Sequence, residues 1–269
     1  MNIIYIKKRR KPSIPWTPSD LTTEPVYWYD AAAITNLSNN DQLNTWTNLG
    51  SGSNAGRDSS TSEPGYPRYR TNQLNGLPGI EWPTFNSNYG TRMWCGNTLT
   101  GGNSQDVTMF TVAKCLNTSG TRQIMVRTAH YEISSGRTAS RWACSFWNGG
   151  FTTQSTTSNY STSQAYLITG IWDKGNTKRI LRQNGTQQNQ TNQVTWTYNY
   201  NFSTLIGSNQ FNSPNLGQTF VGFMYEIILL NQTYSDDNML RTEGYLAHKW
   251  GLTSSLPAGH PYKTNPPYQ

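Results

Sequence analysis

Short apolar segments separated by polar loops run along most of the chain. The segment 107–113 is apolar on both alternating faces, which is typical of a strand buried on both sides. Further strands are predicted at 26–31, 43–48, 79–82, 122–127, 141–147, 165–172, 178–183, 202–206 and 220–230. Turn signals at Asp173 to Asn176 and at Asn184-Gly185 separate consecutive strands. This pattern predicts an all-β chain folded as a two-sheet antiparallel sandwich.

Two polar stretches interrupt the pattern. The Gly- and Ser-rich residues 50–65 predict a long loop. The Asn-, Gln- and Thr-rich tract 186–197 contains Val194 and Trp196, and it predicts a transition from loop to strand.

Helical periodicity is found at the C-terminal end, where it predicts one helix over 235–250. Ser235 is a good N-cap, and two aspartates follow it in the first turn, where the helix dipole is positive. Met239, Leu246 and Trp250 fall on one face. Gly251 stands where a left-handed residue ends helices. We expect this amphipathic helix to lie against the sheet.

The composition fits a single large β domain. The chain has 269 residues, of which 13% are charged and 13% aromatic. The aromatic content argues against disorder, because it supplies large buried areas. We therefore predict one domain over 25–269, preceded by an extended, Pro-containing arm over 1–24. No segment approaches the length of a membrane span.

The positive charge is concentrated in the arm. Lys7, Lys8, Arg9, Arg10 and Lys11 supply five of the seven net positive charges, which leaves +2 for the rest of the chain. A nearly neutral body argues against nucleic acid as a partner. The basic run instead predicts docking onto an acidic partner surface. No export signal is recognised at the start, because the basic run follows the short apolar segment.

Catalytic motifs are missing from the sequence. Cys95, Cys115 and Cys144 lack metal-ligand spacing, and we expect reduced, buried thiols. A glucanase needs two neighbouring carboxylates. Glu226 stands alone in its apolar strand and is predicted to be a buried, hydrogen-bonded structural residue. No catalytic residue is assigned, and we expect a protein that is not an enzyme.

The C-terminal residues carry a family resemblance. The run 243–252, EGYLAHKWGL, with Leu256-Pro257 and His260-Pro261-Tyr262, resembles the closing segment of LamG-like domains. These are concanavalin-type lectin and glucanase jelly rolls of phage virion proteins and bacterial surface proteins. Similar anchors occur at 16–21, 27–31, 45–48, 77–82 and 222–231, so the resemblance spans most of 16–263. It implies a concanavalin-like jelly roll with one C-terminal helix.

The resemblance also raises the question of calcium, which such domains often bind through carboxylates at the rim. Asp30, Asp58, Asp106 and Asp173 are the candidate oxygen donors. However, Ala32 or Ala33 stands where the family usually has an acidic residue, and Asn48 where aspartate is common. Aspartates in turns are far commoner than ligands, so no metal site and no cofactor is predicted.

Two functions follow from the resemblance. The leading prediction is a non-enzymatic virion structural protein of a tailed phage, assembled in the host cytoplasm. It would decorate the capsid or attach to head or tail, dock on capsid or tail subunits through its arm, and form a homo-oligomer, with a trimer favoured. The alternative is a carbohydrate-binding adhesin for host or environmental glycans. Aromatic rings near predicted loops are its candidate contacts, namely Tyr89, Trp94, Trp147, Tyr160 and Tyr198.

Overall fold

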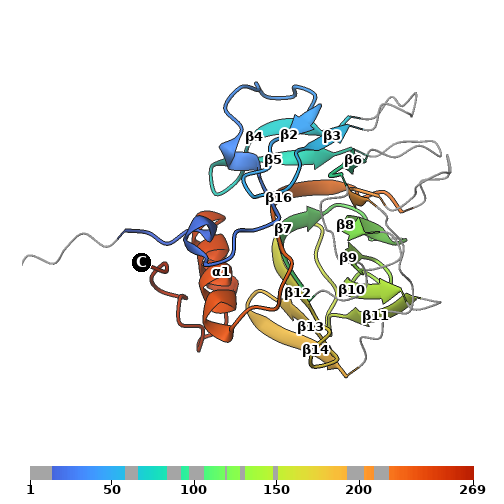
Figure 1. The fold of residues 1–269 in the computed structure, drawn as a ribbon. Coiled ribbons are helices and arrows are strands. Elements are labelled where there is room, and N and C mark those ends of the chain that lie inside the picture. The colour runs from blue at the N-terminus through green and yellow to red at the C-terminus, as the bar shows by residue number, and fades with distance from the viewer. Residues whose placement is uncertain are drawn as a thin grey trace, which may run out of the picture.

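The computed structural model describes residues 14–57, 66–83, 92–96, 106–118, 120–127, 131–147, 151–192, 203–208 and 218–269, with only the backbone described at 126, 127, 147 and 151. It forms three layers, a helix, a sheet beside it and a second sheet beyond (Figure 1). Between the named strands, every pairing is antiparallel. The predicted all-β sandwich with one helix is confirmed, and the arrangement is consistent with a jelly roll.

The sheet next to the helix is called the helix-side sheet. Its strand order is β14 (Thr186–Thr191), β13 (Lys178–Gln183), β12 (Tyr166–Asp173), β7 (Val107–Cys115), β16 (Gly222–Leu230), β5 (Leu77–Trp82) and β4 (Arg68–Leu74). The short β1 (Tyr27–Asp30) also pairs with β16. Strands β7, β12 and β16 are buried almost throughout, because the helix covers one face and the second sheet the other.

The second sheet is called the outer sheet. Its order is β11 (Phe151–Ser155), β10 (Trp142–Trp147), β9 (Tyr131–Ser135), β8 (Arg122–Arg127), β15 (Thr204–Ile206), β6 (Met93–Trp94), β3 (Ala55–Arg57) and β2 (Thr45–Trp46). The main core lies between the sheets and contains Tyr29, Trp46, Trp82 and Trp172. The rings of Trp46 and Trp82 are 6.1 Å apart, which is contact distance for aromatic side chains.

The strand predictions hold best where the sequence is apolar. Strands β8 and β13 begin and end where predicted. Strands β4, β9 and β11 are not among the predicted strands, and β3 falls inside the predicted loop 50–65. Strands β4, β11 and β14 are edge strands of their sheets. An edge strand tolerates polar runs such as TNQ in β4 and TTQ in β11, so it needs no apolar alternation.

Helix α1 (Asp236–Lys249) forms where the sequence predicts it. The Ser235 hydroxyl oxygen accepts a hydrogen bond from the Asn238 backbone N–H at 3.4 Å, and Gly251 has a φ of +69°. Met239, Leu246 and Trp250 are buried against the sheet. The described residues also include short 3-10 helices at Pro18–Asp20, Ala31–Ala33 and Thr253–Ser255.

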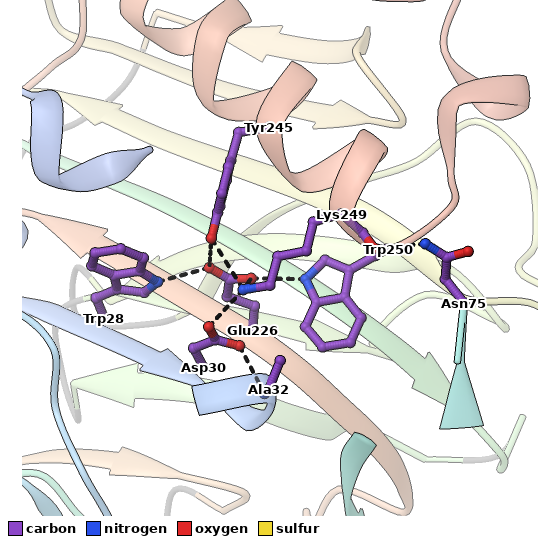
Figure 2. Close-up of polar contacts among 8 residues, drawn as sticks. All are labelled: Trp28, Asp30, Ala32, Asn75, Glu226, Tyr245, Lys249 and Trp250. Carbon is purple, nitrogen blue, oxygen red and sulfur yellow. Dashed lines mark hydrogen bonds and ion pairs between the residues drawn. The ribbon is translucent and has the colours of Figure 1, made fainter. Parts of the chain in front are cut away.

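A buried group of polar and aromatic residues fastens the end of α1 to β1 and β16 (Figure 2). We call it the anchor cluster, and it comprises Trp28, Asp30, Glu226, Tyr245, Lys249 and Trp250. One oxygen of Glu226 accepts from Trp28 Nε1 at 2.7 Å and the Tyr245 hydroxyl at 3.2 Å. The other accepts from Lys249 Nζ at 2.7 Å and Trp250 Nε1 at 2.8 Å. The predicted buried, hydrogen-bonded role of Glu226 is confirmed.

A second buried carboxylate ties the middle of α1 to β12 and β13. Glu243 accepts from Arg182 Nε at 2.8 Å and Nη2 at 3.0 Å, and from the Thr169 hydroxyl at 3.0 Å. His260 Nε2 lies 3.5 Å from the same carboxylate. Burial opposes ionisation of Glu243, but hydrogen bonds from His260 and Arg182 outweigh it and lower its pKa.

The two ends of the described chain lie together. Trp16 N–H donates to the Pro267 carbonyl at 3.0 Å, and Gln269 N–H donates to the Ile14 carbonyl at 3.0 Å. Trp16 is buried beside Tyr245. Of the predicted arm 1–24, residues 14–24 therefore pack on the domain, because Trp16 and Leu21 are apolar anchors. Residues 1–13 lie outside the described residues.

Candidate functional site

An exposed tryptophan lies on the face of the outer sheet that points away from the core. In β6, Met93 is fully buried while the next residue, Trp94, is 39% exposed. This difference follows from strand geometry, since successive side chains point to opposite faces. Trp94 is the most exposed of the tryptophans whose side chains are described. A large apolar ring kept at the surface is a candidate for binding.

The described neighbours of Trp94 across the sheet are a leucine and a glycine. Across the sheet, Trp94 is paired with Leu205 of β15 on one side and with Gly56 of β3 on the other. Leu205 is 1% exposed. A Cβ atom added at Gly56 would meet nothing within 4 Å. Across the sheet the indole therefore has a buried leucine on one side and a residue without a side chain on the other.

Polar side chains occupy the same face further along the sheet. Each oxygen of Glu132 accepts two hydrogen bonds, from Arg137 and Ser134 on one side, and from Arg137 and Gln123 on the other. The Gln123 and Ser134 bonds measure 2.7 and 3.0 Å. Glu132 is fully buried. With its acceptor positions filled by protein donors, this carboxylate fixes the sheet rather than offering an acid or base to a substrate.

An open pocket of about 490 Å³ lies between the chain ends and the first turn of α1. It is lined by Trp16, Asp20, Asp237, Asn238, Arg241 and Gln269. Much of its polar lining is engaged, because Arg241 Nε donates to Asp237 at 2.8 Å and Gln269 Nε2 to Asp20 at 2.6 Å. Trp16 is only 5% exposed, so it offers little aromatic surface. The sequence gives no hint of this pocket, since its residues come from both chain ends.

The predicted glycan contacts separate into three groups. Trp94 is exposed, as stacking requires. Tyr160 is not, and this expectation needs correction: its ring is 4% exposed and packs on Trp142, and its hydroxyl donates to the Asn117 carbonyl at 2.6 Å. The side chain of Trp147, together with Tyr89 and Tyr198, lies outside the described residues. The same is true of the arm residues Lys7, Lys8, Arg9, Arg10 and Lys11.

Two of the candidate calcium ligands come near each other and a third does not join them. Asp106 accepts from the backbone N–H of Lys174, the residue next to Asp173, and Asp173 itself accepts from Asn176. Asp30 instead binds Lys249 and the Ala32 N–H. Asp58 lies outside the described residues. Within the described part of the chain, no group of three or more His, Cys, Asp and Glu side chains is placed to hold a metal ion.

The structure does bring one pair of carboxylates together that the sequence did not reveal. Asp30 and Glu226 are direct partners in the β1–β16 register, and Lys249 binds both. Burial raises the pKa of Glu226, and the Asp30 charge raises it further, while Lys249 acts in the opposite direction. Glu226 is fully buried, so the pair is out of reach of a glycan. Local sequence could not show this contact, because Asp30 and Lys249 are 219 residues apart in the chain.

Three free thiols are buried as expected, at Cys95, Cys115 and Cys144. Burial raises the pKa of both Cys95 and Cys144 to about 12, so these two are not nucleophiles at neutral pH. Among the described residues, no helix has the length and apolar character needed to cross a bilayer.

Comparison with known proteins supports the fold. No protein-family model and no curated protein matches the chain. A botulinum neurotoxin type C structure, from work on cell entry through two ganglioside molecules, has a TM-score of 0.54 at 9% identity and covers 80% of this chain and 50% of that one. The binding domain of botulinum neurotoxin serotype D/C has a TM-score of 0.53 at 10% identity, again covering 80% and 50%. This chain thus matches half the length of those neurotoxin chains.

A carbohydrate-binding module, the CBM40 of the Ruminococcus gnavus IT-sialidase bound to α2,3-sialyllactose, has a TM-score of 0.47 at 14% identity. That match covers 60% of this chain and 93% of the module. The β-sandwich fold is thus shared with the two neurotoxin structures. Nothing in these matches concerns phage particles, so the virion role, the capsid or tail partners and the trimer stay predictions from the sequence resemblance.

Proposed function

We propose that this protein is a carbohydrate-binding module that acts without catalysis. The alternative function predicted from the sequence is thereby preferred to a purely structural virion role. The observation that carries the proposal is the 39% exposure of the Trp94 indole on the outer sheet. The lectin-like fold adds support, since the matched neurotoxin structure is described by its interaction with gangliosides, which are glycolipids.

The chemistry of sugar recognition fits this position. One face of a pyranose ring presents C–H groups, and these pack on an indole with loss of apolar surface from water. Gly56, the neighbour of Trp94 in β3, has no side chain to block a sugar ring that stacks on the indole. Exposed Thr45, paired with Gly56 on the same face, would supply a hydroxyl to the sugar.

The two fully buried glutamates, Glu132 of the outer sheet and Glu226 of the anchor cluster, suit binding rather than hydrolysis. A retaining glycosidase needs two carboxyl groups about 5 Å apart on the two sides of the scissile bond. Glu132 and Glu226 are each fully buried, and each is saturated by protein donors. We therefore expect no hydrolysis of glycans that bind.

A glycan array tests the proposal. The full chain should bind a subset of glycans, and Trp94→Ala should abolish or strongly weaken the signal. Ile14→Ala removes an exposed apolar side chain on the helix side, where Ile14 is 61% exposed, and should leave binding unchanged. Loss of binding in Asp237→Asn but not in Trp94→Ala would move the site to the terminal pocket and contradict the assignment.

A further inference from the structure

The anchor cluster places an amine, a carboxyl group and a second carboxyl group in contact. Lys249, the last residue of α1, reaches across to the two register partners Asp30 and Glu226. Its Nζ lies 2.6 Å from Asp30 Oδ2 and 2.7 Å from Glu226 Oε2 (Figure 2). A nucleophile, an acyl carbon and a proton carrier are thus assembled by three elements that are distant in sequence.

The surroundings of these groups are largely closed to water. Glu226 is fully buried, and the side chains of Asp30 and Lys249 are 9% and 17% exposed. Aromatic rings enclose the amine, with Lys249 Nζ 5.3 Å from the centre of the Tyr245 ring and 5.2 Å from that of Trp250. A poorly hydrated site disfavours separated charges and favours a neutral product over an ion pair.

The two oxygens of Asp30 have different partners. Oδ1 accepts the Ala32 backbone N–H at 2.9 Å, a donor that would stabilise negative charge on this oxygen during attack at the carboxyl carbon. Oδ2 faces Lys249 and so lies next to the protons of the cluster. Oδ1 is placed to become an amide carbonyl oxygen, and Oδ2 to leave.

We propose that Asp30 and Lys249 form an intramolecular amide bond in the folded protein, with Glu226 as the proton-transferring catalytic residue. Glu226 carries one proton from the Lys249 ammonium to Asp30 Oδ2, and the neutral Nζ attacks Cγ of the resulting neutral carboxyl group. A C–N bond forms, and negative charge collects on Oδ1. Glu226 then carries a second proton from Nζ to Oδ2, the Oδ1 carbonyl re-forms as the Cγ–Oδ2 bond breaks, and water leaves.

The step balances without any further reagent. One ammonium and one carboxylate become one amide and one water, and Glu226 returns to its starting state. The two indole donors and Tyr245 hold the Glu226 carboxyl group in place. Burial, which raises the pKa of Glu226, helps it to hold a proton in transit.

Other buried ion pairs in the described residues do not offer this chemistry. Glu132 is paired with Arg137 and Glu243 with Arg182. A guanidinium remains protonated and is a poor nucleophile. Among the ion pairs between described residues, those of Lys249 are the ones in which the cation is a lysine; the others involve arginine or histidine. The amide would join the first strand covalently to the end of the helix and so hold both ends of the domain together.

Mass spectrometry of the purified full chain decides the question. The folded protein should be lighter than its sequence by the mass of one water. Trypsin should fail to cleave after Lys249, and a branched peptide should link Asp30 to Lys249. A mass equal to that of the sequence, with normal cleavage after Lys249, would overturn the proposal, and so would a water loss that maps elsewhere.

Variants separate the chemistry from simple packing. Lys249→Arg keeps the positive charge and Glu226→Gln keeps hydrogen-bonding capacity, yet both should have the full sequence mass. Lys263→Arg is the matched control, because Lys263 Nζ donates to backbone carbonyls of Thr253, Ser254 and Leu256 and to no carboxylate. It should retain the missing water. If a variant does not fold, the wild-type mass and peptide map still decide the outcome.

Discussion

Removal of the Arg182 guanidinium should destabilise the domain far more than removal of a partly exposed arginine. Arg182→Met keeps much of the aliphatic volume but takes both charged donors from Glu243, at 2.8 and 3.0 Å. Glu243 is fully buried and Arg182 is 11% exposed, so water cannot replace the lost bonds. The Gly185 carbonyl also loses its donor, Arg182 Nη2 at 2.6 Å.

The size of the effect follows from this burial. A buried ion pair broken by loss of one partner costs about 3–5 kcal/mol, because an uncompensated charge remains. Arg70 is the matched control: it pairs with Glu81 at 2.7 Å, but the two side chains are 32% and 21% exposed. Exposed pairs contribute about 0–1 kcal/mol. Arg182→Met should therefore exceed Arg70→Met by at least about 2 kcal/mol.

Urea unfolding at several pH values measures the difference. The folded pKa of Glu243 is lowered, so its contribution to stability is present above the ordinary carboxyl pKa and is lost as pH falls through the folded value. The gap between wild type and Arg182→Met should thus be full at neutral pH and shrink below about pH 4. Equal losses for Arg182→Met and Arg70→Met, or a gap independent of pH, would refute the reasoning.

Two further predictions concern packing and reactivity. Gly244→Ala places a Cβ 2.5 Å from Tyr262 Cβ and should cost about 1–2 kcal/mol in thermal unfolding despite the better helix propensity of alanine. Gly259→Ala, where an added Cβ meets nothing within 4 Å, should be near neutral, and equal effects would contradict this packing. Cys95 and Cys144, whose pKa is raised to about 12 by burial, should resist a thiol reagent at neutral pH until the protein unfolds, and rapid labelling of the native state would contradict their burial.

The helix and the central strands can be predicted from the sequence because their signals are local. Ser235, Gly251 and the spacing of the apolar residues act within a few turns, so they specify α1 without knowledge of its partners. Strands β7 and β16 are apolar on both faces and are covered on both sides. Polar edge strands such as β14 carry no comparable pattern, because solvent accepts their side chains.

The sites were much harder to foresee. Trp94 could be predicted as a candidate because aromatic rings near loops suit glycan binding. The sequence around it does not distinguish it from Tyr160, which is buried in the fold. The anchor cluster joins Asp30, Glu226 and Lys249 only through the β1–β16 register and the docking of α1. Such contacts between distant residues are set by topology, and local sequence does not contain them.

The three layers also separate the proposed functions of the molecule. The chain ends and the anchor cluster lie on or beside the helix, and the outer sheet that carries Trp94 lies across the sandwich (Figure 1). A partner held at the chain ends would leave the outer sheet exposed for a ligand. This arrangement suits a module that is fixed on one side and binds glycans on the other.

Titration calorimetry with a glycan selected on the array tests the central claim most directly. Wild-type protein should bind with a heat that saturates at one glycan per Trp94 site. Trp94→Ala should raise Kd about ten- to a hundredfold, which corresponds to roughly 1.4–2.8 kcal/mol for the lost ring contact. Ile14→Ala should bind like wild type. An unchanged Kd in a folded Trp94→Ala variant would contradict the proposal that this face of the outer sheet is the carbohydrate-binding site.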